Sequence, residues 1–162
     1  MTITGPTLRR ILVSNHLIIT KSKIMTTKTV KFIAFIVLLV HGIGHFQGVA
    51  AGLGLKINSS FPSKSWLLKS FSDNFDKTAC LIIFFTTGAI GILTALSFKG
   101  VFMPDAWQIL SIITAILSTI CLFTFPNGFA FFFNKAGAIA VNLIIYYSIV
   151  FNQNWPEVLF NE

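Results

Sequence analysis

Four long apolar runs constrain this chain more than any other feature: residues 30–53, 79–98, 106–125 and 130–151. A transmembrane helix needs about 20 predominantly apolar residues, and each run reaches that length. Backbone groups in lipid must pair within their own segment, so we expect each run to be helical. None of the runs alternates apolar and polar residues as a membrane β-strand does. We therefore predict an all-α membrane protein.

The connections between these runs predict the topology. Residues 99–105 and residues 126–128 form short links that contain Gly and Pro, and helices linked in this way pack as antiparallel neighbours. The expected architecture is an antiparallel four-helix transmembrane bundle within residues 28–152. We expect a basic, disordered tail over residues 1–27 and a short tail over residues 153–162.

The connection between the first and second runs, residues 56–77, is longer and more polar than the others. Within residues 63–75, the apolar side chains fall within about 100° of one helical face, and Trp66 is suited to the headgroup region. Two alternatives follow from this pattern. The segment is either a short interfacial helix between the first two spans or an ordinary loop with aromatic anchors.

Composition favours a lipid environment. Hydrophobic residues make up 54% of the 162 residues and charged residues only 10%, whereas about a quarter of a typical soluble domain is charged. The formal charge of +7 comes from basic residues spread over the tail and the loops. This spread favours contact with anionic headgroups, since no nucleic-acid-binding motif accompanies it. Cys80 and Cys121 lie in apolar runs without a CxxC or a metal-ligand spacing.

The orientation depends on the balance of basic residues. Four spans place both termini on one side, and that side carries seven basic residues against five on the other. The positive-inside rule then predicts cytoplasmic termini in the plasma membrane. If Met25 is the start, the balance becomes three against five. A signal peptide is the rival interpretation of the first run, but its apolar character continues past the histidines, which favours a retained helix.

The first run holds the least ordinary chemistry of the chain. His41, Gly44, His45, Gly48 and Gly52 fall within an arc of about 100° on a helical wheel,. The three glycines form a doubled small-xxx-small motif, which lets a second helix approach closely. The motif predicts that this face packs against a neighbouring helix, with both histidines turned toward protein.

Polar side chains inside the hydrocarbon need hydrogen-bonding partners. Ser111 and Ser118 share a stripe of the third run, and Asn142 is the deepest strong hydrogen-bonding group outside the first run. We predict a buried polar network that joins these three residues to His41 and His45 and fixes the register of the helices.

The same histidines are the candidates for a cofactor site. They lie one turn apart on one helix, so they cannot bind a single haem from both sides. Haem ligation across a homodimer, or a Zn or Cu ion on the pair, are the remaining alternatives. No carboxylate lies inside the runs, and no Ser–His–Asp set or ATP-binding loop occurs. We therefore expect no catalytic residue, metal site or cofactor, with His41 and His45 kept as cofactor-binding candidates.

Two sequence elements carry a family resemblance. LLVHGIGHFQGVAAGLGL in the first run and NKAGAIAVNLIIYY in the last resemble the HGxxHxxGF-like and AGxxxNL-like elements of small uncharacterised bacterial four-helix membrane proteins, which are loosely similar to DoxX-like proteins. The resemblance covers residues 30–151 and implies a four-helix fold and a membrane location, but no activity. The arginine-rich first-span signature of DoxX proper is missing, which argues against a redox-subunit role.

These features predict a multi-pass membrane protein with a non-enzymatic structural or accessory role. One alternative is a membrane redox subunit that associates with a quinone or a haem through His41 or His45, and another is a small transporter or channel. The expected partners are the lipid bilayer and either further copies of the chain in a homo-oligomer or a larger membrane complex. No nucleic-acid partner is expected.

Overall fold

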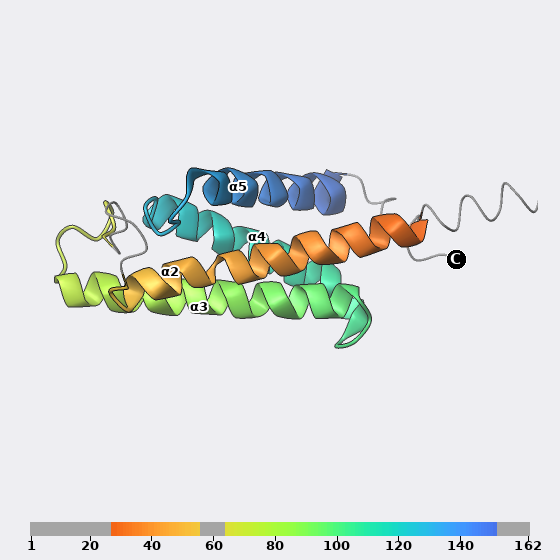
Figure 1. The fold of residues 1–162 in the computed structure, drawn as a ribbon, viewed down its shortest axis with the longest axis horizontal. Coiled ribbons are helices and arrows are strands. Elements are labelled where there is room, and N and C mark those ends of the chain that lie inside the picture. The colour runs from red at the N-terminus through yellow and green to blue at the C-terminus, as the bar shows by residue number, and fades with distance from the viewer. Residues whose placement is uncertain (1–26, 56–63, 152–162) are drawn as a thin grey trace, which may run out of the picture. The chain divides into compact units, whose positions relative to one another are not determined.

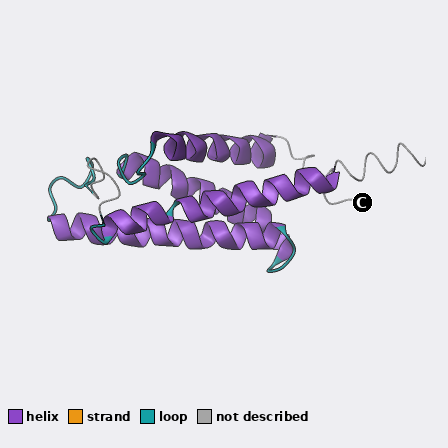
Figure 2. Cartoon of the chain, viewed as in Figure 1, coloured by secondary structure: helices purple, strands orange, loops and turns teal. Residues whose placement is uncertain are grey.

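The computed structural model describes residues 27–55 and 64–151 of the chain (Figure 1). The predicted C-terminal tail and nearly all of the predicted N-terminal tail lie outside these ranges, as does the first part of the connection between the first two spans. Over the two described ranges the chain forms helices joined by turns, without a β-strand (Figure 2).

Within the described residues, four helices are long and apolar enough to cross a membrane: Thr27–Gly52, Asp73–Phe98, Pro104–Thr124 and Phe132–Ile149. The last two turns of the first helix are α2 (Phe46–Gly52), and the other elements are α3 (Asp73–Phe98), the 3-10 turn η1 (Pro104–Ala106), α4 (Trp107–Thr124), α5 (Phe132–Tyr146) and the π-helical turn η2 (Tyr147–Phe151). The predicted all-α fold with four spanning helices is confirmed, and these helices indicate an integral membrane protein.

The second helix, α3, begins at Asp73, inside residues 56–77, for which the sequence predicts a connection. Ser72 caps α3, because its Oγ accepts the backbone N–H of Phe75 at 3.3 Å,. Asp73 and Asp76 lie in the first turn, where a carboxylate interacts favourably with the helix dipole,. Residues 64–72 form turns and bends rather than a helix. Of the two alternatives for this connection, the loop with aromatic anchors therefore holds over these residues.

Glycines end the first helix and α3. Gly54 and Gly100 have φ angles of +76° and +81°, a region that favours glycine,. The N–H of Gly100 donates to the carbonyl of Ser97, and the N–H of Val101 donates to the carbonyl of Leu96, both at 2.9 Å. This Schellman motif satisfies the last carbonyls of α3. The same pattern of bonds surrounds Gly54, so both glycines mark where the chain leaves its helix.

Successive helices pack against one another: α2 against α3, α3 against α4, and α4 against α5 (Figure 1). Between α3 and α4 the hydroxyls of Thr94 and Thr114 lie 2.9 Å apart, and the hydroxyl of Thr87 lies 3.3 Å from the Sγ of Cys121. Each threonine hydroxyl is also within hydrogen-bonding distance of a carbonyl one turn back on its own helix. These three threonine hydroxyls are thus satisfied within the protein,.

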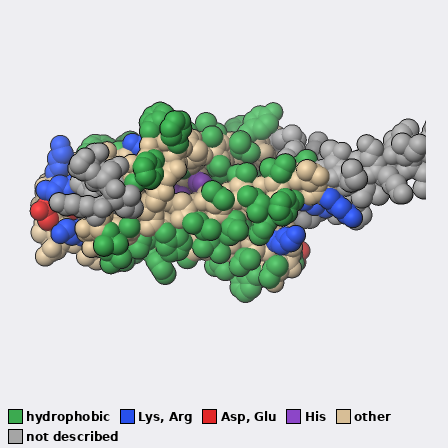
Figure 3. Space-filling model, viewed as in Figure 1, with side chains coloured by type: hydrophobic (Ala, Val, Ile, Leu, Met, Phe, Trp, Pro, Cys, Tyr) green, Lys and Arg blue, Asp and Glu red, His purple; other side chains and the backbone are tan. Residues whose placement is uncertain are grey.

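Small side chains fill much of the interior, and large apolar side chains cover the outside. Ala95 and Ala115 are fully buried, whereas Ile109 and Phe123 are more than half exposed. Figure 3 shows apolar side chains along the helices and charged side chains near their ends. Lipid tails suit such an outer surface, because they are as apolar as the side chains that contact them.

Candidate functional site

The first helix changes its hydrogen-bonding pattern at the second histidine. The backbone N–H of His45 donates to the carbonyl of Gly42, three residues back, at 3.2 Å, and the N–H of Gly48 donates to the carbonyl of His45 at 3.0 Å. These 3-10 bonds are tighter than α-helical bonds, and they separate residues 27–44 from α2. A tightened turn inside a helix often marks a functional or strained position.

Both histidine rings lie inside the protein. His45 is fully buried and His41 is 7% exposed, and their rings meet edge to face with centroids 5.1 Å apart. The His45 ring also contacts Phe84 at 5.9 Å and Phe129 at 5.4 Å between centroids. The rings of His41, Phe84 and Phe129 surround His45 and leave no room for a bound group unless they move. His41 is therefore the histidine that a ligand can approach.

The predicted polar network forms only in part. Asn142 Nδ2 donates to Ser118 Oγ at 2.9 Å and to Thr119 Oγ1 at 3.3 Å, which joins α5 to α4. Ser111 Oγ donates instead to the carbonyl of Trp107 on its own helix at 2.7 Å. The Asn142 side chain faces α4 because α5 packs on α4.

The histidines do not join this network. Among the described residues, the Nε2 of His41 and both ring nitrogens of His45 are buried without a hydrogen-bond partner. An unpaired polar group in an apolar interior costs about 1–3 kcal/mol. These three nitrogens therefore do not form the predicted bonds to Asn142, Ser111 or Ser118.

The glycine motif packs differently from the prediction. A Cβ on Gly48 would overlap the ring of Phe84, and a Cβ on Gly52 would lie 2.8 Å from the backbone nitrogen of Leu81, so both glycines meet α3. Gly44 was expected to pack too, but a Cβ there has no described atom within 4 Å. It lies at the edge of the predicted face, away from the glycines that meet α3.

The first helix also approaches the backbone of α3 closely at Gly42, which lies outside the predicted glycine motif. A Cβ on Gly42 would lie 2.7 Å from the backbone nitrogen of Ile92 and 2.8 Å from the backbone carbon of Gly91. A Cβ on Gly88 would lie 2.7 Å from the ring of Phe46. The signal available in the sequence was the presence of Gly88 and Gly91 in the second run, because small residues on a transmembrane helix let another helix approach closely,.

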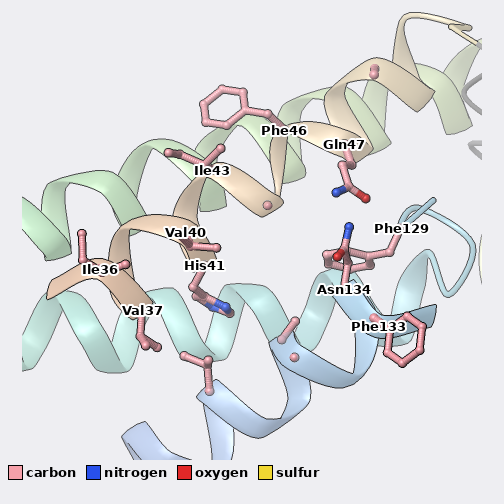
Figure 4. A pocket seen from close by; sticks show the side chains of 15 residues that line it. Ile36, Val37, Val40, His41, Ile43, Phe46, Gln47, Phe129, Phe133 and Asn134 are labelled. Carbon is pink, nitrogen blue, oxygen red and sulfur yellow. The ribbon is translucent and has the colours of Figure 1, made fainter. Parts of the chain in front are cut away.

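A groove of about 770 Å³ opens between the first helix and α5 (Figure 4). Apolar side chains form most of both walls, among them Ile36, Val40 and Ile43 on the first helix and Phe133 and Val141 on α5. α5 is also the least covered span, since 17% of its most apolar window is buried against 39% for α3. Among the described elements, α5 packs extensively on α4 and not on α2, which is consistent with an open groove beside the first helix.

Three polar side chains line this groove: His41, Gln47 and Asn134. Figure 4 shows His41 directed from the first helix toward α5, and Gln47 and Asn134 facing one another at one end of the groove. Gln47 Oε1 accepts the backbone N–H of Ala130 at 3.2 Å, which ties the first helix to the segment before α5. An apolar cavity with a few polar groups is typical of a small-molecule site.

Two glycines widen the groove. Gly44 and Gly137 both line it, and a Cβ built on either one has no described atom within 4 Å. A larger side chain at these positions would therefore fill the groove rather than the helix contacts. Gly44 thus has a role in the site, although not the packing role that was predicted for it.

The histidines and cysteines do not assemble into a metal centre in the described part of the chain, where no three His, Cys, Asp or Glu residues are grouped to hold an ion. The Sγ of Cys80 contacts the carbonyl of Gly48 at 3.4 Å, and Cys121 contacts Thr87. Both thiols are free and buried, and they pack as small apolar side chains.

The groove brings together two predicted residues, His41 and Gly44, with two polar residues that were not predicted, Gln47 and Asn134. The latter two lie far apart in the chain, and no motif links them. Comparison of the chain with known protein families, with curated proteins and with solved structures gives no match.

Proposed function

We propose that this membrane protein binds a lipid-soluble molecule in the groove between the first helix and α5, and that it serves as an accessory protein without enzymatic activity. The position of His41 carries the proposal. Its side chain is 7% exposed, lines an otherwise mostly apolar groove, and has an Nε2 atom without a partner among the described residues. A ligand that shares a hydrogen bond with this nitrogen would relieve the cost of burying it.

The dimensions of the groove favour a small ligand over a partner helix. Its volume of about 770 Å³ falls in the usual range of small-molecule sites, about 300–1,000 Å³. The bond between Gln47 and Ala130 joins the two walls at one end. A partner transmembrane helix would instead need a groove that is open across about 30 Å of hydrocarbon.

The lining predicts the chemistry of the ligand. Apolar walls suit an acyl chain, a prenyl chain or a ring system, because burial of apolar surface contributes most of the affinity in such sites. His41, Gln47 and Asn134 suit a single carbonyl or hydroxyl group. We therefore expect an amphipathic molecule with one polar head that enters from the bilayer. A prenylated quinone belongs to this class.

The test compares the lipid-soluble molecules that copurify with four proteins, the wild type and three variants, extracted from native membranes in a mild detergent. Gly44→Phe places a ring in the groove, where a Cβ has open space. Ile82→Phe is the matched control, because Ile82 is 58% exposed on α3 and lies outside the groove. The organic extracts are analysed by mass spectrometry against equal amounts of protein.

We expect one molecule in near-stoichiometric amount with the wild type and with Ile82→Phe, and its loss from Gly44→Phe. His41→Phe should reduce the amount retained, because it removes the imidazole. Identical extracts from all four proteins would contradict the proposal. A retained quinone would favour the redox alternative, and an optical spectrum of the purified protein would detect a haem.

We also propose that both termini are cytoplasmic in the plasma membrane. The proposal is supported by the seven basic residues on the side of the termini against five on the other,. A green fluorescent protein fused after Glu162 should then fluoresce, whereas alkaline phosphatase fused at the same position should be inactive in a bacterial host. The reverse pattern would assign the opposite orientation.

A further inference from the structure

A second cleft, of about 310 Å³, lies between the loop over residues 64–71 and the first turn of α3. It shares no lining residue with the groove described above. Two lysines, Lys64 and Lys69, and two aspartates, Asp73 and Asp76, line it. The cleft therefore holds opposite charges in equal number, which suits a dipolar ligand better than an anion or a cation.

Asp76 is the residue that points to a ligand. Its side chain is 95% buried, since only 5% of it is exposed. One carboxylate oxygen, Oδ2, accepts the backbone N–H of Ser65 at 3.2 Å. The other, Oδ1, is buried and has no partner among the described residues. A buried carboxylate oxygen without a donor is unfavourable, so a donor group in the cleft would complete this site.

The walls of the cleft are held in place by the end of α4. The Oγ of Ser65 donates to the carbonyl of Thr124 at 2.7 Å, and the indole N–H of Trp66 donates to the carbonyl of Phe123 at 2.6 Å. The same Ser65 Oγ accepts the backbone N–H of Leu67 at 3.1 Å. These bonds position the loop beside Asp76 before any ligand arrives, which reduces the entropy lost on binding.

The lysines supply the second pole of the site. Lys64 forms an exposed ion pair with Asp73 at 3.2 Å, whereas Lys69 has no ion pair within the described ranges. A phosphate group near the lysines and an ammonium group at Asp76 would match both poles. Only a primary or partly methylated ammonium can donate to the Asp76 Oδ1, because a trimethylammonium group has no N–H.

We propose that this cleft binds the phosphoethanolamine headgroup of a membrane lipid. Asp76 accepts a hydrogen bond from the ammonium, and Lys69 with Lys64 contacts the phosphate. The lipid is the favoured source over soluble phosphoethanolamine, because the cleft lies where an apolar spanning helix begins. Trp66 and Phe71 also line it, and aromatic side chains are enriched at the headgroup level.

The first experiment needs no variant. The full-length protein in detergent is titrated with phosphatidylethanolamine, its N-methyl and N,N-dimethyl derivatives and phosphatidylcholine, all with the same acyl chains, and binding is measured by native mass spectrometry. We expect affinity to fall mainly at the last step, from the N,N-dimethyl derivative to phosphatidylcholine, by about tenfold, which corresponds to one charge-assisted hydrogen bond. Equal affinity across the series would overturn the proposal, as would tighter binding of phosphatidylglycerol.

Two variants test which residues bind the ammonium and the phosphate. One soluble competitor tests whether the ligand is a lipid. Asp76→Asn should abolish the preference for phosphatidylethanolamine over phosphatidylcholine, and Lys69→Gln should weaken both lipids alike. Asp105→Asn, in the turn before α4, is the matched control and should change neither. An unchanged preference in Asp76→Asn would overturn the role of Asp76. Soluble O-phosphoethanolamine should bind far more weakly than the lipid, and equal binding would overturn the lipid as the source.

Discussion

The two sides of the first helix show how the same residue type behaves in opposite surroundings. On one side, Gly42 approaches the backbone of Gly91 and Ile92 so closely that a methyl group does not fit. Two residues further on, Gly44 lines the groove, where a methyl group has no described neighbour within 4 Å. Glycine produces a tight helix crossing in the first place and an open groove in the second, because the element opposite differs.

The largest effect is expected where the helices cross. Gly42→Ala places a Cβ 2.7 Å from a backbone nitrogen, which cannot move aside as a side chain can. We expect a loss of about 2 kcal/mol in the free energy of unfolding, measured by thermal unfolding in detergent. Gly44→Ala is the matched control and should have no such effect. Equal losses from the two variants would show that the crossing and the groove do not differ in packing.

The attachment of α5 is expected to contribute less. Asn142→Ala removes the bonds to Ser118 and Thr119 that join α5 to α4, so the far wall of the groove should loosen. Interhelical hydrogen bonds in membranes contribute about 0.6 kcal/mol on average, so we expect a loss of about 1 kcal/mol. A double-mutant cycle with Ser118→Ala should give a coupling energy of similar size. Additive losses would mean that the pair does not interact.

His45 lies between the crossing and the groove, and its replacement should act in the opposite direction. Both of its ring nitrogens are buried without partners in the described part of the chain. His45→Leu replaces the imidazole, with its two unpaired nitrogens, by an apolar side chain of comparable size. We expect the melting temperature to stay the same or to rise by an amount that corresponds to less than about 1 kcal/mol. A clear fall would reveal a partner for the imidazole.

The smallest effect is expected on the groove side. Gly137→Ala adds a methyl group where no described atom lies within 4 Å, so the free energy of unfolding should change by less than about 0.5 kcal/mol. The comparison is with Gly88→Ala, whose Cβ would lie 2.7 Å from the ring of Phe46. If both variants unfolded at the temperature of the wild type, the contrast between a packed and an open glycine would be lost.

The fold was predictable because the length of an apolar run and the absence of water in lipid leave few alternatives. The face of the first helix that packs against α3 was not predictable. Gly42 and Gly44 lie about 160° apart around the helix, and the pattern of the first run alone does not say which of them meets α3. The position of α3 decides this, and the sequence of the first helix carries no direct record of it.

The candidate sites were less predictable than the fold. The wheel placed His41 toward the interior, where it lies, but Gln47 and Asn134 belong to separate helices and no spacing rule relates them. The unpaired oxygen of Asp76 was also missed, because the sequence placed this residue outside the second span. The Oγ of Ser72 accepts the backbone N–H of Phe75 and caps α3 at its N-terminus. Asp76 therefore lies in the first turn of a helix, where it accepts the backbone N–H of Ser65.

The bonds between Thr94 and Thr114 and between Thr87 and Cys121 give α3 and α4 polar contacts of their own within the bilayer. Residues 99–103 are short enough that the two helices are neighbours from the start. We therefore expect α3 and α4 to enter the membrane during synthesis as one pre-paired hairpin, in which three threonine hydroxyls and one thiol already have partners. The first helix and α5 would then associate with a finished surface.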